Sequence, residues 1–242
     1  STGPWLDGMA GLGLPADCQV CKQWSAAGLC ASCEQRFCTH PPRCRRCALV
    51  LPAAAGAEAG AGLVCGQCLE VPAPWQHAVC AEDYAFPWNG LITEFKFRGD
   101  VGLASLLADR LAAALRQAPQ ALNVDMVLPV PLSAQRLRER GFNQAWELTR
   151  RLARVFGLKA EPDLLQRPVD TAHQVDLSVQ DRARNLRGAF MVEPSRREAL
   201  SGRRVALVDD VMTTGATFRA ATHALLAAGA LSVDVWAVAR TP

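Results

Sequence analysis

The sequence predicts an α/β protein in which a parallel sheet, with helices on both faces, follows a small cysteine-rich module. Eight of the ten cysteines fall in four CxxC pairs, all within residues 18–68. From residue 100 onward, buried-strand patterns alternate with helical patterns, which is typical of a parallel sheet with crossover helices. Apolar residues make up 50% of the 242-residue chain, so it can fill one medium and one small core.

The four CxxC pairs have the spacing of zinc knuckles. Two intervening residues turn the backbone so that both sulfurs can reach one tetrahedral ion, at about 2.3 Å. A cross-braced pairing has the same spacing and stays an alternative, whereas a redox role would not need four copies. Taken in sequence order, the pairs predict two structural zinc sites, Cys18, Cys21, Cys30 and Cys33, then Cys44, Cys47, Cys65 and Cys68.

The cysteine-rich module is expected to span residues 1–80. An Ala/Gly-rich stretch over residues 51–63 is interpreted as an insertion in the second zinc loop. Cys38 and Cys80 are left over and are interpreted as ordinary small residues. No segment has the length and apolarity of a membrane span, and no signal peptide is visible. The thiol usage and these absences predict a cytoplasmic protein.

The second domain is expected over residues 81–242. Asp100 is suited to cap a helix whose leucines share one face, and Asn143 to cap the next helix, which Gly157 ends. Ligands of open parallel sheets bind beyond the carboxyl ends of the strands. The expected elements are strands over 125–130, 205–208 and 231–239 and helices from 100, over 143–156 and over 217–228.

Two adjacent aspartates and a threonine-rich turn follow the strand at 205–208. Asp209 and Asp210 can accept hydrogen bonds from sugar hydroxyls or from hydrated Mg²⁺. Backbone N–H groups at the start of the next helix favour an anion, and Gly215 allows close approach. This combination predicts a ribose 5-phosphate site. The alternative is that the aspartates only cap the helix, for which one would suffice.

The stretch VALVDDVMTTGAT at 205–217 resembles the signature of the type I phosphoribosyltransferases. Three further stretches resemble the ComF family, bacterial proteins that join an N-terminal cysteine-rich zinc module to such a domain. These stretches are FKFRGD at 95–100, VPLSAQRLRERGFNQA at 130–145 and Q-x-x-L-x-x-x-x-R-x-x-N at 174–185. The resemblance implies a parallel-sheet type I phosphoribosyltransferase fold preceded by a zinc-ribbon-like module.

The resemblance also assigns roles to residues of the site. Asp209 and Asp210 would be the catalytic acidic pair that contacts the ribose hydroxyls of phosphoribosyl pyrophosphate, with Mg²⁺ as cofactor. The loop at 129–133 would face the pyrophosphate, and Val130–Pro131 is a candidate cis bond there. The phosphate loop would comprise Thr213, Thr214, Gly215, Ala216 and Thr217. Further candidates are Arg136 and Arg140 toward the pyrophosphate, and Gln174, Arg182 and Asn185 on a closing loop.

Purely structural roles are the alternatives for several of these residues. Arg136 and Arg140 have the pattern of surface helix charges, and Asn143 that of a helix cap. Thr213 stands where some purine-salvage members of the phosphoribosyltransferase group carry an aspartate that acts as a base toward the nucleobase. A hydroxyl cannot act as that base at neutral pH. The sequence therefore predicts the residues that bind the sugar phosphate but not those that bind the acceptor.

Charge and family resemblance both point to nucleic acid. Residues 133–204 hold fifteen Arg/Lys against nine Asp/Glu, which fits either a phosphate-rich partner or a solvated surface. Basic and aromatic residues interleave in FKFR at 95–98, as in single-strand DNA contacts or in a half-buried amphipathic segment. ComF-family members are associated with DNA uptake in natural transformation. Two functions are expected as alternatives: a sugar-phosphate-binding protein of DNA uptake, with single-stranded DNA and uptake proteins as partners, or a phosphoribosyltransferase of nucleotide metabolism with an unknown acceptor.

Overall fold

The structure is a computed structural model that describes residues 16–25, 28–52, 63–98, 100–168 and 188–242. The chain divides into two compact units, Ser1–Thr39 and His40–Pro242. In the first unit, β1 (Ala16–Asp17) pairs antiparallel with β2 (Trp24–Ser25), and α1 (Ala31–Phe37) follows. None of the helices in the described ranges combines the length and apolarity needed to cross a membrane.

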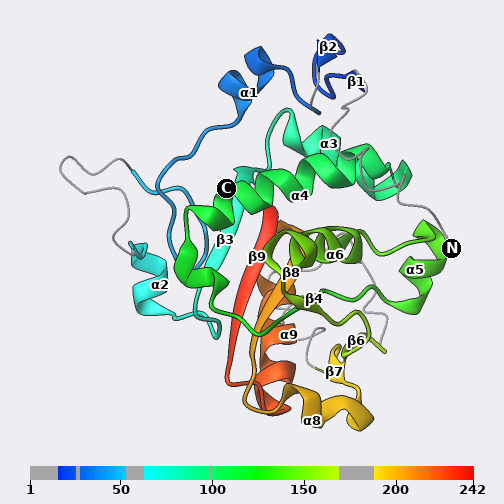
Figure 1. The fold of residues 1–242 in the computed structure, drawn as a ribbon. Coiled ribbons are helices and arrows are strands. Elements are labelled where there is room, and N and C mark those ends of the chain that lie inside the picture. The colour runs from blue at the N-terminus through cyan, green and yellow to red at the C-terminus, as the bar shows by residue number, and fades with distance from the viewer. Residues whose placement is uncertain (1–15, 26–27, 53–62, 99, 169–187) are drawn as a thin grey trace, which may run out of the picture. The chain divides into compact units, whose positions relative to one another are not determined.

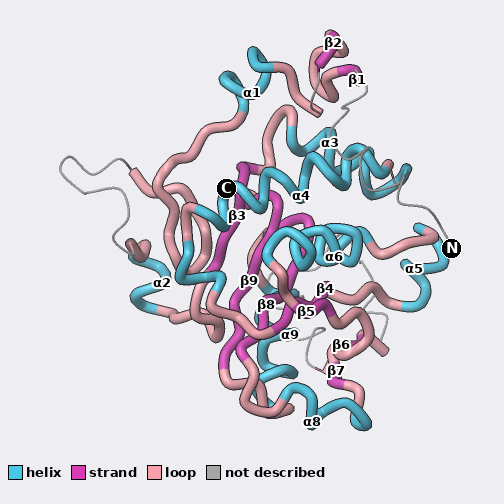
Figure 2. Tube along the Cα trace, in the orientation of Figure 1, coloured by secondary structure: helices cyan, strands magenta, loops and turns pink. Residues whose placement is uncertain are grey.

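A five-stranded sheet forms the centre of the second unit (Figure 2). Its order is β3-β9-β8-β4-β5, and all four neighbouring pairs are parallel. The predicted parallel sheet is therefore confirmed. A separate antiparallel pair joins β6 (Leu165–Gln166) to β7 (Met191–Val192). The sheet strands are β3 (Ala78–Asp83), β4 (Met126–Pro129), β5 (Lys159–Ala160), β8 (Arg204–Met212) and β9 (Ser232–Arg240).

Helices cover both faces of this sheet, as Figure 1 shows. Val205 and Leu207 of β8 pack with Phe218 and Leu225 of α9 (Ala216–Ala227) on one face. Because side chains alternate along a strand, Ala206 and Val208 face the other side, where α4 (Val101–Arg116) and α6 (Gln144–Phe156) lie. The remaining helical elements are α2 (Gly66–Glu70), α3 (Trp88–Arg98), α5 (Ala134–Arg140), α8 (Arg197–Leu200) and two short 3₁₀ turns, Pro119–Leu122 and Pro194–Arg196.

The predicted caps of α4 and α6 are confirmed. Asp100 accepts hydrogen bonds from the amides of Gly102 at 2.6 Å and Leu103 at 3.3 Å. Asn143 accepts one from the amide of Ala145 at 2.9 Å, so capping explains this residue without a ligand. Gly157 ends α6 in the left-handed conformation, with φ of 65°.

The division of the chain differs from the one expected at residue 80. Strand β3 runs across that position, and the compact unit begins at His40, so the second cysteine set lies in the same unit as the sheet. The physical reason is backbone bonding. The amide of Ala78 donates to the carbonyl of Arg45 at 2.7 Å, next to the third CxxC pair.

One local expectation is wrong, and the half-buried amphipathic interpretation of FKFR at 95–98 is confirmed. Among the described residues the cis peptide bond is Phe86–Pro87, not Val130–Pro131. The FKFR segment ends helix α3, where Phe95 is buried and Phe97 is 76% exposed. A helix separates these two rings by about 200° around its axis, and only one of them can therefore reach the core.

Candidate functional site

Two cysteine tetrads have geometry suited to metal ions. In each, the four sulfur atoms lie within 4.8 Å of one another. The grouping follows sequence order, as the sequential pairing predicts, rather than a cross-braced order. One tetrad is Cys18, Cys21, Cys30 and Cys33, and the other is Cys44, Cys47, Cys65 and Cys68.

The two tetrads repeat one local structure. In the first pair of each, a tight turn closes: the amide of Lys22 donates to the carbonyl of Cys18 at 2.9 Å, and that of Ala48 donates to Cys44 at 2.7 Å. Lys22 and Ala48 both have positive φ, 63° and 57°. In the second pair, the first cysteine stands at the N-cap position of a short helix, α1 or α2. The chain thus builds the same four-sulfur cradle twice.

The thiol chemistry of the tetrads fits a structural Zn²⁺. Burial works against ionisation of Cys18 and Cys44, but surrounding backbone N–H groups lower their pKa values to about 6 and about 7. Burial and neighbouring sulfurs raise the pKa of Cys33 to about 12. A bound divalent cation offsets the repulsion between neighbouring thiolates, so its binding releases the thiol protons. Four sulfurs leave no open position for water, so such an ion would be structural.

The aspartate pair lies at the carboxyl edge of the sheet, near the end of β8. Because side chains alternate along a strand, Asp209 and Asp210 point to opposite faces. The Oδ1 of Asp209 accepts from the amide of Asp210 at 2.9 Å, and the Oδ1 of Asp210 from the amide of Val211 at 3.0 Å. Neither side chain caps α9, whose N-cap residue is Gly215. The capping explanation is therefore wrong.

The two carboxylates have different environments. Asp210 is 4% exposed, and its Oδ2 lies 2.7 Å from the ammonium of Lys96 in α3. Asp209 is half-buried. That burial, and then the charge of Asp210, raise its pKa well above the ordinary range. A cation or several hydroxyl donors beside Asp209 would oppose this shift and favour the carboxylate.

The threonine loop joins β8 to α9 as expected. Thr213 and Thr214 are exposed, and Gly215 adopts φ of 76°, a left-handed conformation suited to glycine. Among the bonds recorded for the described residues, Thr214 Oγ1 accepts a long one, 3.4 Å, from the amide of Ala216. No side chain of the N-cap residue, Gly215, caps the twelve-residue helix α9, and the N-terminus of a helix favours an anion.

The other candidate residues fall in two groups. Arg136 and Arg140 are half-buried in α5, which follows the 129–133 loop and is capped by Ser133. Gln174, Arg182 and Asn185 lie outside the described residues. The structure thus brings the aspartates and the threonine loop together along β8 and places α5 after the neighbouring strand β4.

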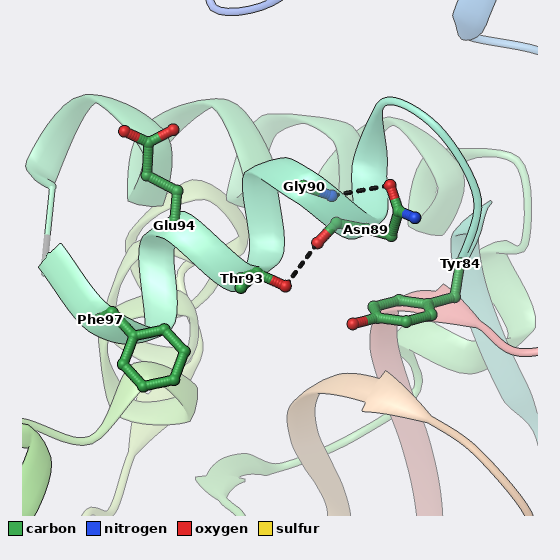
Figure 3. Close-up of a pocket in the computed structure, with 6 residues that line it drawn as sticks. All are labelled: Tyr84, Asn89, Gly90, Thr93, Glu94 and Phe97. Carbon is green, nitrogen blue, oxygen red and sulfur yellow. Dashed lines mark hydrogen bonds between the residues drawn. The ribbon is translucent and has the colours of Figure 1, made fainter.

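An open hollow of about 550 Å³ lies beside α3 (Figure 3). The rings of Tyr84 and Phe97 stand at its two ends, with Asn89 and Thr93 between them. Thr93 Oγ1 donates to the carbonyl of Asn89 at 2.7 Å. The hollow is therefore lined by two aromatic rings, a carboxamide and the carboxylate of Glu94, and not by the threonine loop.

Three residues near the site were missed by sequence reasoning. Lys96 was interpreted as part of a DNA contact or of a half-buried amphipathic segment, but it pairs with Asp210. Trp75 packs under Gly215, and Arg240 bonds to the carbonyl of Met212, which precedes the loop. No short sequence pattern predicts the contacts of a buried tryptophan or arginine. The only signal for these two residues was a large side chain among small residues.

A parallel sheet whose strand β8 carries an acid pair near its end, and is followed by a threonine turn, defines a domain of the phosphoribosyltransferase class. A family model described as the phosphoribosyl transferase domain matches residues 150–242. The chain belongs to the ComF family. It is 35% identical over 236 residues to the DNA utilization protein YhgH of Escherichia coli, covering 95% of this chain and 99% of that protein.

Two further relatives carry competence names. The match to competence protein F of Haemophilus influenzae is 34% identical over 216 residues and covers 88% of this chain and 90% of that protein. The match to competence protein ComFC of Bacillus subtilis is 29% identical over 151 residues and covers 62% and 58%. The match to YhgH, at 95% of this chain, is long enough to include cysteine-rich sequence as well as the sheet.

Proposed function

We propose that this chain binds phosphoribosyl pyrophosphate, or a related ribose 5-phosphate, together with Mg²⁺ at the carboxyl edge of its sheet. The observation that carries the proposal is the sequence of groups along β8 and α9. An acid pair, two exposed threonines, a left-handed glycine and the start of a helix follow one another in eight residues, 209–216. Carboxylates that accept hydrogen bonds from sugar hydroxyls then lie next to N–H and O–H groups that donate to a phosphate. A ribose 5-phosphate requires both.

The roles of the residues follow from their chemistry. The amides at the start of α9 and the hydroxyls of Thr213 and Thr214 hold the 5-phosphate. Asp209 accepts hydrogen bonds from the ribose hydroxyls, and the ammonium of Lys96, 2.7 Å from the Oδ2 of Asp210, holds that side chain in place. When bound, Mg²⁺ supplies positive charge to the pyrophosphate. Arg136 and Arg140 are candidates to add cationic charge from α5.

The link to DNA rests on the relatives and on one surface. Their printed names concern DNA utilization and competence, so we propose a role in DNA uptake for this chain, with single-stranded DNA as a partner. The hollow beside α3 supports a contact with unpaired bases, because Tyr84 and the exposed Phe97 offer ring faces on which a base can stack. We further propose that residues 1–80, which hold both tetrads, act as a metal-binding module in this role, although the second tetrad lies in the same compact unit as the sheet.

The second candidate function is an active phosphoribosyltransferase with an unknown acceptor. The same aspartates and loop favour it, and the aromatic hollow could hold a flat acceptor. Release of pyrophosphate in the presence of nucleobases would establish turnover. Binding of phosphoribosyl pyrophosphate without release for any base would favour the binding function.

Titration calorimetry with phosphoribosyl pyrophosphate and Mg²⁺ tests the sugar-phosphate site. We expect heat from the wild type and none from the double variant Asp209→Asn, Asp210→Asn. Asp163→Asn removes an exposed carboxylate outside the loop and should bind like the wild type. No heat from the wild type would remove the proposal, and equal heat from the double variant would move the site elsewhere.

Metal analysis of the purified chain tests the tetrads. We expect about two zinc ions per chain, one for each four-sulfur set. Paired Cys→Ser changes in either set should each remove about one ion. A single ion in the wild type would mean that one tetrad does not bind zinc.

A further inference from the structure

The second cysteine tetrad and the threonine loop are joined by two buried side chains. The first is Trp75. Its indole N–H donates to the carbonyl of Arg46 at 2.6 Å, and the Arg46 guanidinium donates back to the carbonyl of Trp75 at 2.7 Å. Arg46 lies between Cys44 and Cys47, and its amide donates to the sulfur of Cys44 at 3.4 Å. The indole is therefore held by the knuckle itself.

The other edge of the same indole lies against the threonine loop. A Cβ atom placed on Gly215 would stand 3.2 Å from the Cη2 of Trp75. The Trp75 ring meets Phe218 edge-on, with centroids 6.4 Å apart. The guanidinium carbon of Arg219 lies 5.7 Å from the Trp75 centroid. One indole thus supports the glycine of the loop and the first turn of α9.

Arg240 makes the second connection. Its Nε donates to the carbonyl of Cys47 at 2.9 Å, and its Nη1 donates to the carbonyl of Met212 at 3.3 Å. Met212 is the last residue of β8 and directly precedes Thr213. The entrance of the loop is therefore tied to Cys47 through Arg240, while its exit is tied to Arg46 through Trp75.

We propose that Trp75 and Arg240 are positioning residues that transmit the metal-held shape of the Cys44–Cys47 knuckle to the threonine loop. Metal at the second tetrad then sets the affinity of the loop for ribose 5-phosphate, and metal at the first tetrad does not. The affinity effect rests on the proposed function, whereas the mechanical connection does not. The physical basis is that both ends of a short loop share buried partners that stay ordered only while the knuckle is closed.

The geometry fits this role better than a purely structural one. A tryptophan that only filled the core could point its N–H at any acceptor, but here both hydrogen bonds of the pair run to one knuckle residue. The Trp75 ring also lies so close to Gly215 that a Cβ atom there would make a tight contact of 3.2 Å. A shift of the knuckle would consequently move the ring and change the path of the loop.

Ligand affinity and zinc content of three variants test the connection. Trp75→Phe keeps a ring but loses the N–H donor. We expect it to retain about two zinc ions and to bind phosphoribosyl pyrophosphate about tenfold more weakly. Cys47→Ser should lose one ion and weaken binding similarly. The matched change Cys21→Ser, in the first tetrad, should lose one ion without weakening binding. Unchanged affinity in Trp75→Phe, or equal weakening in both cysteine variants, would overturn the proposal.

Hydrogen exchange separates this proposal from the sugar-phosphate site. Without any ligand, amides of residues 216–219 should exchange faster in Trp75→Phe and in Cys47→Ser than in the wild type, but not in Cys21→Ser. If the wild type binds no ligand, the proposed function fails while this readout still tests the connection. Arg240→Lys keeps the charge but cannot bond to the carbonyls of Cys47 and Met212 at the same time. This variant replaces Trp75→Phe in the experiment if Trp75→Phe does not fold. Protection of the loop that is equal in all variants would refute the connection.

Discussion

The ammonium of Lys96 lies 2.7 Å from the Oδ2 of Asp210 and joins helix α3 to the carboxyl end of β8. Asp210 is almost fully buried, so an unpaired charge there would be costly. The same helix presents Asn89, Thr93 and Phe97 to the aromatic hollow. The pair therefore connects the hollow to the acid pair, although the two features are more than a hundred residues apart in the chain.

Lys96→Met should lower the free energy of unfolding by about 2 kcal/mol, because it leaves the Asp210 carboxylate buried without its cation. Denaturant unfolding at fixed zinc concentration measures this. Adding Asp210→Asn should restore most of the loss. Lys159→Met is the matched control. Lys159 lies 2.7 Å from Glu161 but is 61% exposed, so its removal should cost less than about 1 kcal/mol. Equal losses in the two single variants would contradict the buried-pair interpretation.

Gly215→Ala should destabilise the protein by about 2 kcal/mol, since the methyl group meets both a left-handed backbone and the Trp75 ring. Gly157→Ala has the same backbone problem, with φ of 65°, but no atom lies within 4 Å of the new Cβ. We expect it to cost about 1 kcal/mol. Thermal unfolding compares the two variants. The close contact would be irrelevant if Gly157→Ala were as damaging as Gly215→Ala.

Glu82 should make stability depend on pH near neutrality. Burial raises the pKa of its carboxyl group to about 7, although the guanidinium of Arg110, 2.9 Å away, acts in the opposite direction. In the unfolded chain the pKa is about 4.3. The folded state therefore binds more protons between these values, and the stabilisation present below pH ~4.3 is lost as pH rises through 7.

Unfolding free energies from pH 5 to 8 test this for Glu82→Gln. Relative to the variant, the wild type should lose about 2 kcal/mol across the range. The comparison uses the slope of the unfolding free energy against pH. Glu82→Gln also removes a partner from Arg110, and this lowers the unfolding free energy at all pH values. Parallel curves for the two proteins would show that Glu82 does not titrate in this window.

Phe97→Ala should weaken binding of single-stranded DNA about tenfold, since one stacked base contributes about 1–3 kcal/mol. Leu231→Ala removes another exposed apolar side chain, 66% exposed, and should leave binding unchanged. Filter binding across a salt series measures both. Stacking involves no phosphate, so the salt slope of Phe97→Ala should equal that of the wild type. If Phe97→Ala binds as tightly as Leu231→Ala, the hollow is not the contact.

The parallel sheet could be predicted because its information is local. Residues 205–208 form an apolar run that ends in charge, and Gly157 ends a periodic helix. Asp100 and Asn143 cap their helices within three residues of themselves. Strand β3 was missed because AVCAED, partly polar, becomes a strand by pairing with β9, over 150 residues away. The compact-unit boundary at residue 39 also depends on such long-range bonds.

The sequence by itself determined the chemistry of this protein: four CxxC pairs, an acid pair and a threonine loop, each readable because its members lie within a few residues of one another. Tertiary structure alone decided what surrounds them. Lys96 reaches Asp210 because α3 crosses the carboxyl edge of the sheet, and Trp75 reaches Gly215 because the second knuckle packs on the same unit. Contacts between distant segments depend on packing of the whole core, and no short stretch of sequence carries that information.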